Sequence, residues 1–222
     1  MKGLAFAAAS ALGGLIAAAP ERIVPIEAEP HHELKFQNRH VRLFDVQLPP
    51  GYRSLVHTHL HDGVFVNVEA SETTAQELGG EVVVRPPRVL GETTFINYTK
   101  SPKAHRVENI GRTLFRVVDT EIHEGCGGFA ATTDAAGQSP VLENERVRVT
   151  RLALDPGQTL SLPPTCGMLV ALRPATLEFR SPGGTETLAA DRAGFKWRDS
   201  FAPVVLANVG AAVFHGIDIV VK

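Results

Sequence analysis

The sequence has few cysteines, few aromatic residues and no block of like charge. Only two of its 222 residues are cysteine, and 6% are aromatic, with a single tryptophan. Lysine and arginine together number 22 against 24 aspartates and glutamates, so the formal net charge is -2. Proteins that bind nucleic acids carry a clustered excess of positive charge. The charge balance therefore argues against DNA or RNA as a partner.

Long hydrophobic runs are also missing from most of the chain. No stretch of about 18 or more continuous apolar residues follows position 20, so we expect no membrane-spanning helix there. No long stretch keeps a helical period. Hydrophobic residues still make up 44% of the sequence, which is enough to bury a core and argues against wholesale disorder.

Residues 1–19 differ from the rest of the chain. Lys2 is followed by an apolar, alanine-rich run that ends at Ala19, just before Pro20. Such a run is typical of an export signal that is removed from the mature protein. We therefore predict a signal peptide over residues 1–19, a periplasmic or secreted location, and no membrane span after signal removal. Export would permit a disulfide between Cys126 and Cys166, but the sequence leaves that pairing open.

An internal repeat covers most of the remaining sequence. Residues 38–51 and 144–157 share six identities in fourteen positions at a constant offset of 106, and a second match follows each of them. The matched pairs include Asn38/Asn144, Gly51/Gly157, Asn109/Asn208, Phe115/Phe214 and Asp119/Asp218. The chain thus contains two units of similar size.

The repeat predicts the domain organisation. We expect an N-terminal arm at 20–33, a first domain at 34–123, a linker at 124–139 that is rich in Gly, Ala, Thr and Ser, and a second domain at 140–222. Within each unit, short runs of β-branched residues end at Gly or Pro. This texture predicts an all-β fold, with a barrel or jelly roll in each unit.

Three of the nine histidines lie within five residues, at alternate positions. On an extended strand the side chains of His57 and His59 share one face, and His61 joins them if the strand stays straight. Two imidazoles from one strand, with a third from elsewhere, can fill one face of a transition-metal ion. This is the strongest functional signal in the sequence.

The residues around these histidines resemble a known family. Gly51, five residues and then His57-x-His59 resemble the first motif of the cupins, and the tandem repeat resembles their two-domain form, the bicupins. Gly91 with the strand-like run after it, followed by His105-x-x-x-Asn109, resembles the second motif. The resemblance implies two tandem cupin-type β-barrels, each a double-stranded β-helix or jelly roll. The glutamate of the first motif is absent, because Gly63 and Val64 occupy its expected positions.

The resemblance implies a metal site in the N-terminal cupin. His57, His59 and His105 become the ligands of one divalent transition metal per chain, with Fe(II) favoured and Mn, Ni or Zn as alternatives. We expect His61 beside the metal as a catalytic, proton-handling group. Whether His61 or Asp62 replaces the missing glutamate is left open.

The second unit lacks the corresponding ligands. Pro163, Thr165 and Val204 stand where the first unit has its histidines, and His215 falls outside the ligand positions. We therefore predict a second cupin without metal that serves a structural role.

The expected function is that of an exported metal-dependent enzyme acting on a small organic substrate. The resemblance implies a three-histidine iron dioxygenase first, a member of the oxidoreductases. A cupin isomerase, decarboxylase or lyase, or a non-catalytic bicupin that binds or senses a small ligand, is the alternative. A homodimer is left open. Several polar strand residues are candidates for substrate contact, although the sequence does not say which face of residues 115–121 points inward: Arg53, Asn67, Tyr98, Arg116 and Glu121.

Overall fold

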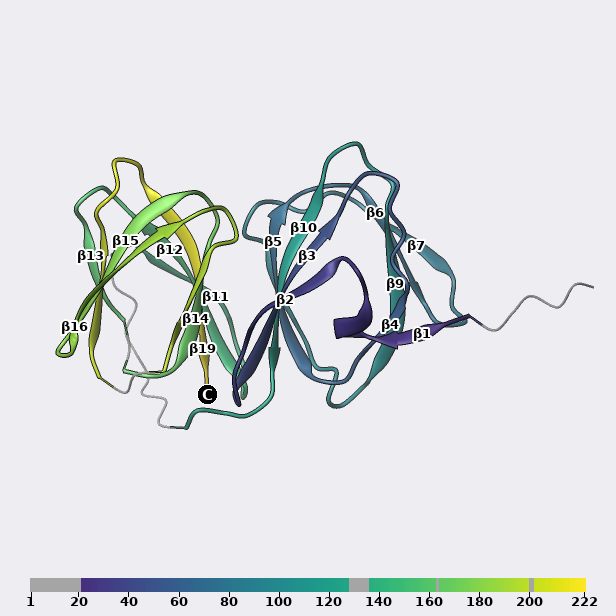
Figure 1. Ribbon diagram of the computed structural model, residues 1–222, viewed down its shortest axis with the longest axis horizontal. Helices are drawn as coiled ribbons and strands as arrows, with labels where there is room; N and C mark the ends of the chain where they lie inside the picture. The colour runs from purple at the N-terminus through teal and green to yellow at the C-terminus, as the bar shows by residue number, and fades with distance from the viewer. Residues whose placement is uncertain (1–20, 128–135, 163, 200–201) are drawn as a thin grey trace, which may run out of the picture.

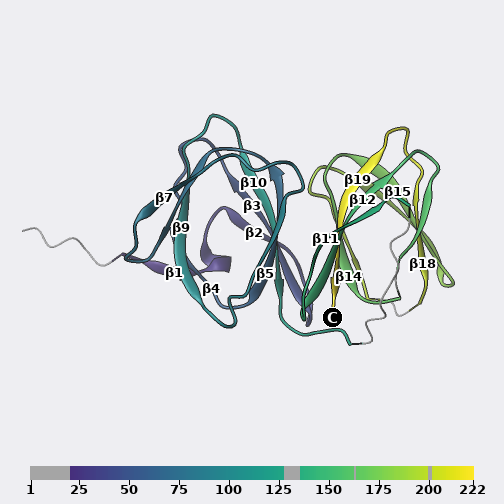
Figure 2. The ribbon, with the colours of Figure 1, turned by 180° about the vertical axis from the view of Figure 1, so that it is seen from behind.

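The computed structural model describes residues 21–127, 136–162, 164–199 and 202–222. Two β-barrels lie side by side, the first drawn in purple to teal and the second in green to yellow (Figures 1 and 2). The one helical segment among the described residues is a short 3-10 turn, η1 (Ile26–Ala28). No helix in these ranges is long and apolar enough to span a membrane.

The first barrel consists of two five-stranded sheets that face each other. One contains, in spatial order, β1 (Ile23–Pro25), β4 (Val56–His59), β9 (Lys103–Asn109), β6 (Thr73–Glu77) and β7 (Val82–Arg85). The other contains β2 (His32–Gln37), β3 (Val41–Leu48), β10 (Phe115–Ile122), β5 (Asp62–Glu69) and β8 (Thr93–Ile96). Apart from the parallel pair β1–β4, the strand pairs of this barrel are antiparallel.

The second barrel repeats this plan with fewer strands. Its first sheet contains β11 (Gln138–Glu143), β12 (Val147–Leu154), β19 (Phe214–Val221), β14 (Gly167–Ala171) and β17 (Phe195–Arg198). Its second sheet contains β13 (Thr159–Leu162), β18 (Val204–Asn208), β15 (Ala175–Ser181) and β16 (Gly184–Ala190). The observed architecture is the expected pair of all-β barrels.

The segment expected as an N-terminal arm is part of the first barrel. Residues 23–25 are extended and pair with β4, and Ile26 is buried in the barrel interior. Strand β2 begins at His32, two residues before the predicted domain boundary. Similarly, β11 begins at Gln138, inside the predicted linker. The ordered strands therefore extend beyond the repeated sequence, because edge strands need no shared motif.

The Asn and Gly identities of the repeat form turns at the ends of strands. Asn109 Nδ2 donates to the carbonyls of Leu48 and Thr113 at 2.8 Å each, and Asn208 Nδ2 makes the equivalent two bonds at 2.9 and 2.8 Å. Gly51 and Gly157 both have a φ of 78°, where glycine is favoured. Their amides donate to the carbonyls of Asn109 and Asn208, at 2.8 Å each. The repeat was detectable because both barrels close their ends with the same hydrogen bonds.

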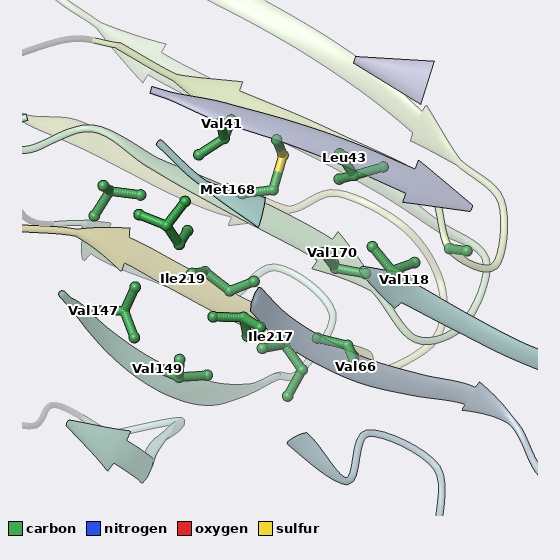
Figure 3. Close-up of a cluster of buried hydrophobic side chains, with 14 of the residues drawn as sticks. Val41, Leu43, Val66, Val118, Val147, Val149, Met168, Val170, Ile217 and Ile219 are labelled. Atoms are coloured by element: carbon green, nitrogen blue, oxygen red, sulfur yellow. The ribbon is translucent and has the colours of Figure 1, made fainter. Parts of the chain in front are cut away.

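The most extensive apolar cluster lies between the barrels (Figure 3). One side chain in two along β3, β5 and β10 points away from the first barrel and packs on the first sheet of the second. Its members include Val41, Leu43, Val66 and Val118 from the first barrel, and Val147, Val149, Met168, Val170, Ile217 and Ile219 from the second. Burial of this apolar area fixes the two barrels to each other.

The interiors of the two barrels differ. The second is filled by large aliphatic and aromatic side chains, including Leu152, Leu160, Leu177, Phe179, Leu206 and Phe214. The apolar cluster of the first is smaller and contains Ile26, Phe44, Val46, Leu48 and Val117. The first barrel therefore has room for a polar site.

A disulfide joins the end of the first barrel to the second. Cys126 follows β10, and Cys166 directly precedes β14, with their Cα atoms 6.2 Å apart. Together with His40 these sulfur atoms form a group of potential metal ligands. Because both sulfurs are bonded to each other here, we assign this group a structural role.

Candidate metal centre

Three imidazole rings meet inside the first barrel. Strands β4 and β9 pair with His57 directly opposite His105, and His59 lies two residues along β4 on the same face. The ring centroids are 5.1 Å apart for His57 and His59, 4.8 Å for His57 and His105, and 5.0 Å for His59 and His105. The structure thus brings together the three residues that the sequence nominated as ligands.

The nitrogen atoms of this group are arranged for a metal ion. One potential ligand atom from each ring lies within 4.8 Å of the others. His57 Nδ1 lies 2.9 Å from the Leu55 carbonyl and can donate a hydrogen to it; in the neutral ring this leaves Nε2 as the unprotonated nitrogen. That Nε2 atom is buried and has no hydrogen-bond partner in the described structure. A buried nitrogen lone pair without a donor fits a coordinated cation.

Burial also keeps the three rings neutral. Burial, followed by the electrostatic effect of the neighbouring His32, lowers the pKa of His57 to about 4. For His59 and His105, burial and then the charge of neighbouring histidines lower the pKa to about 2 and about 3. Neutral imidazole is the form that binds metals, so all three rings are ready ligands at neutral pH.

Aromatic and aliphatic side chains form the walls of a pocket over these rings. Tyr98 is buried and stacks on His59, with ring centroids 4.7 Å apart and planes inclined by 20°. Phe65 contacts both rings edge-on. Burial raises the pKa of Tyr98, so its phenol stays protonated at neutral pH. The pocket therefore offers an apolar, aromatic surface beside the ligands.

The outer part of the pocket is positively charged. Arg85, Arg88 and Lys103 all line it. Lys103 pairs with Glu77, and Arg88 lies 3.6 Å from Glu92. Arg85 has no hydrogen-bond or ion-pair partner within the described ranges. Its guanidinium is thus available to a ligand.

A fourth histidine, which the sequence did not nominate, also lines the pocket. The His32 ring lies 4.4 Å from the His57 ring, centroid to centroid. Its Nδ1 is 2.5 Å from the buried carboxylate of Glu29, which also accepts a hydrogen bond from the Tyr52 hydroxyl at 2.9 Å. Burial by itself would raise the pKa of Glu29, but the hydrogen bond and charge of His32 lower it to about 2. The only signal in the sequence was a histidine three residues after a glutamate in the arm.

Asp119 on β10 belongs to the segment whose inward face the sequence left open. The structure shows that Phe115, Val117 and Asp119 line the pocket, which settles the inward face of this strand. The Asp119 carboxylate is completely buried, and neither oxygen has a hydrogen-bond partner among the described residues. Its Oδ2 lies 3.8 Å from His59 Nδ1. Burial, followed by the charge of Glu121, raises the pKa of this carboxyl well above its ordinary value.

His61, expected beside the metal, lies elsewhere. Strand β4 ends at His59, so the alternation that would bring His61 to the same face does not continue. Its ring stacks on His123 at 3.9 Å between centroids, and it is not among the residues that line the described pocket. Asp62 is buried, accepts the Thr99 amide at 2.9 Å and lies 3.2 Å from Arg146 Nε. Neither residue stands in for the missing glutamate.

The other polar candidates divide into two groups. Asn67 and Tyr98 line the pocket. Arg53 is paired with Glu108 at 3.8 Å, Arg116 is paired with Asp45 at 2.7 Å, and the buried Glu121 is paired with Arg42 at 2.6 Å. The sequence could not distinguish the pocket residues from the ion-paired residues, because in both groups polar and apolar side chains alternate along the strands.

At the corresponding positions of the second barrel, the described residues offer no ligand set. Thr165 is buried, and its hydroxyl donates to the Cys166 carbonyl at 3.0 Å. Val204 packs in the apolar interior. Pro163 lies outside the described residues. His215 is a partly exposed residue of β19.

No protein-family model matches the chain, and no curated protein matches it. Solved structures do share its fold. AerE from Microcystis aeruginosa superposes with a TM-score of 0.65 at 13% identity, over 89% of this chain and 96% of that one. A Cupin 2 conserved barrel domain protein from Leptotrichia buccalis gives 0.53 at 10%, over 84% and 86%. Oxalate decarboxylase from Bacillus subtilis, whose Mn(II) centres have been studied, gives 0.57 at 8%, over 82% and 69%.

At these identities the likeness concerns the fold. The similarity spans both barrels, since it covers more than four fifths of the chain in each case. It agrees with the arrangement of two tandem jelly-roll barrels. The chain therefore has the fold of these cupin structures, with two tandem barrels.

Proposed function

We propose that the protein is a metal-dependent enzyme that acts on a small organic anion, and that it is a three-histidine iron dioxygenase. The observation that carries this proposal is the buried, unpartnered Nε2 of His57 within a cluster of three neutral histidines. That cluster lies in a pocket with cationic residues in its outer part. A divalent ion on neutral ligands keeps its full charge, which favours an anionic substrate.

His57, His59 and His105 would hold the ion. Imidazole ligands suit Fe(II), and equally Mn, Ni or Zn, so the choice of iron rests on the resemblance. A ferrous ion supplies the one-electron chemistry that reactions with dioxygen require. The protein supplies neutral ligands and a largely buried site for it.

The remaining pocket residues would bind and orient the substrate. Arg85 offers five N–H donors in a planar fork that matches a carboxylate or an enolate. Phe65 and Tyr98 exclude water from the space beside the ligands and provide a surface for an apolar substrate body. A substrate with one acidic end and one apolar end fits this division.

A metal-dependent decarboxylase is the second candidate. It is favoured by the fold likeness to oxalate decarboxylase and by the unpaired Arg85, which suits a small dicarboxylate as well. The two candidates use the same ligands and differ in their need for dioxygen.

The test is turnover by the full-length protein after anaerobic loading with Fe(II) or Mn(II). Oxygen uptake and carbon dioxide release are measured with catechols, diketones, thiols and small carboxylic acids. We expect oxygen uptake by the iron form, its loss in His57→Ala and His105→Ala, and its retention in the control His215→Ala. For Arg85→Ala we expect at least a tenfold rise in KM.

Carbon dioxide release without oxygen uptake would replace the dioxygenase by the decarboxylase. Tight ligand binding with neither reaction would indicate a non-catalytic module.

We also propose export of the mature protein. The Cys126–Cys166 disulfide supports it, since disulfides persist in oxidising compartments. Fractionation of expressing cells, with mass spectrometry of the mature N-terminus, checks this. Cytoplasmic recovery of chains that keep residues 1–19 would contradict it.

A further inference from the structure

Each barrel has a buried aspartate at the same position of its last strand, but the side chains around the two aspartates differ. Asp119 and Asp218 occupy matching positions on β10 and β19, the last strand of each barrel, and their exposed fractions are 0% and 3%. Asp218 lies 2.5 Å from the buried guanidinium of Arg198. Asp119 has no cation of the chain at hydrogen-bond distance and no hydrogen bond within the described ranges.

Strand pairing identifies what has changed between the barrels. Arg198 pairs with Gly167 on β14, and the corresponding pair in the first barrel is Ile96 with Gly63. The first barrel therefore has an isoleucine where the second has the arginine that compensates its aspartate. An isolated buried carboxylate is strongly destabilising, so a positive partner is expected.

The surroundings of Asp119 indicate where that positive charge belongs. Its Oδ2 lies 3.8 Å from His59 Nδ1, itself buried and without a hydrogen-bond partner in the described structure. The missing side chain of Gly63 makes room, since a Cβ atom there would lie 3.1 Å from Asp119 Oδ1. In this position the carboxylate faces the side of the His59 ring that carries Nδ1, which leaves Nε2 for an ion.

We propose that Asp119 is the positioning residue and counter-charge of the metal centre: it accepts the Nδ1 hydrogen of His59, directs His59 Nε2 to the ion, and offsets the charge that three neutral histidines leave. Partners of this kind behind a ligating histidine raise its basicity and fix its orientation. The ion supplies the positive charge that compensates Asp119 in the first barrel, as Arg198 does for Asp218 in the second. The inference rests on metal binding but not on the reaction catalysed.

The experiment compares Asp119→Asn with the matched control Asp218→Asn in the full-length chain. Affinity for Zn²⁺ and Mn²⁺ is measured by competition with a chromophoric chelator, and the unfolding midpoint of the metal-free protein by denaturant titration. For Asp119→Asn we expect a 10- to 100-fold loss of metal affinity. The metal-free midpoint should stay the same or rise, because the carboxyl group that is replaced is buried and has no hydrogen-bond partner in the described structure.

Asp218→Asn should behave in the opposite way. It leaves Arg198 buried beside a neutral amide, so the midpoint should fall while metal affinity stays within twofold of the parent. Asp119→Ala repeats the test if the asparagine variant does not fold. In Zn²⁺-loaded protein labelled with ¹⁵N at histidine, the His59 Nδ1–H resonance should lose its downfield shift in Asp119→Asn.

Metal affinity within twofold of the parent in Asp119→Asn would overturn the inference. So would a lowered metal-free midpoint like that of Asp218→Asn, which would make Asp119 a structural residue. If the parent protein binds neither ion, the metal centre itself is refuted. Absence of turnover leaves the inference intact, since no step of this experiment depends on a substrate.

Discussion

The ring of His32 lies against the ring of His57, with centroids 4.4 Å apart and planes inclined by 56°. His32 belongs to β2, and Glu29 just before that strand holds its Nδ1 at 2.5 Å. The chain segment that precedes the repeat therefore forms one wall of the candidate metal centre. Substitutions in this segment should affect both the stability of the first barrel and its pocket.

Glu29→Gln tests this wall through its pH dependence. The pKa of Glu29 is lowered from 4.5 to about 2, so its stabilising contribution is fully present above about pH 4.5 and is lost as the pH falls toward 2. We expect the variant to be less stable than the parent by about 2 kcal/mol at pH 7, and the difference to vanish near pH 2.

Urea unfolding at several pH values measures this difference. Glu33→Gln is the control, since the Glu33 side chain is 62% exposed and forms a surface ion pair with Lys35. A stability difference that is the same at pH 7 and pH 3 would contradict the proposed charge interaction.

Asn109 and Asn208 should be equally important to their barrels. Replacing either by alanine leaves the buried carbonyl of Leu48 or Leu154 without its donor and removes a second, partly buried hydrogen bond, at a cost of about 2–4 kcal/mol. Chemical denaturation of both variants measures the losses. Asn97→Ala is the control, because the hydrogen bond that its side chain accepts from the Lys100 amide is exposed. A cost below about 1 kcal/mol for either buried asparagine would refute the shared role.

These asparagines explain why the sequence predicted the fold well. The two turn-forming Asn and Gly positions and the β-branched runs are local features, and they specify strand ends and strand faces without reference to the other barrel. The parity of His57 and His59 on one strand is local in the same sense. Their convergence with His105 depends on β4 lying beside β9, and for that the prediction needed the resemblance to known motifs.

The orientation of the residues that the sequence left open depends on contacts between distant parts of the chain. Both faces of strand β10 mix apolar and polar side chains: Phe115 and Val117 alternate with Arg116 and Val118, and Asp119 and Glu121 alternate with Thr120 and Ile122. Either face could therefore line a barrel interior. The second barrel decides the matter, since Val118 packs against it. His61 illustrates the opposite problem, because alternation holds only as far as the strand does, and β4 stops at His59.

The disulfide between Cys126 and Cys166 should stabilise the protein. It closes a loop of 40 residues, which predicts a contribution of about 2–4 kcal/mol. Thermal unfolding of the oxidised protein and of the Cys126→Ser/Cys166→Ser variant, with thiol titration of both, tests this. Free thiols in the non-reduced parent would show that the bridge does not form.

Ile219→Ala tests the contact between the barrels. Ile219 is fully buried in the cluster that both barrels share, so truncation should cost about 2–5 kcal/mol. We expect a single unfolding transition that moves as a whole, measured by calorimetry. Val83→Ala, at a site that is 56% exposed, should change stability by less than about 0.5 kcal/mol. Two separate transitions, of which only one moves, would contradict the shared core.

Strand β10 differs from an ordinary barrel strand, because it buries two carboxylates beside Val117 inside its barrel and aliphatic side chains on the outer face of that barrel. Val118 and Ile122 point away from their own barrel, while Asp119 and Glu121 point into it. Without the second barrel, these aliphatic side chains would be exposed to solvent unless they pointed into the first barrel and filled its interior. The second barrel covers these side chains, so the interior of the first barrel can hold a pocket with charged residues. The apolar interior and outer face of the second barrel thus allow the first barrel to keep its polar site.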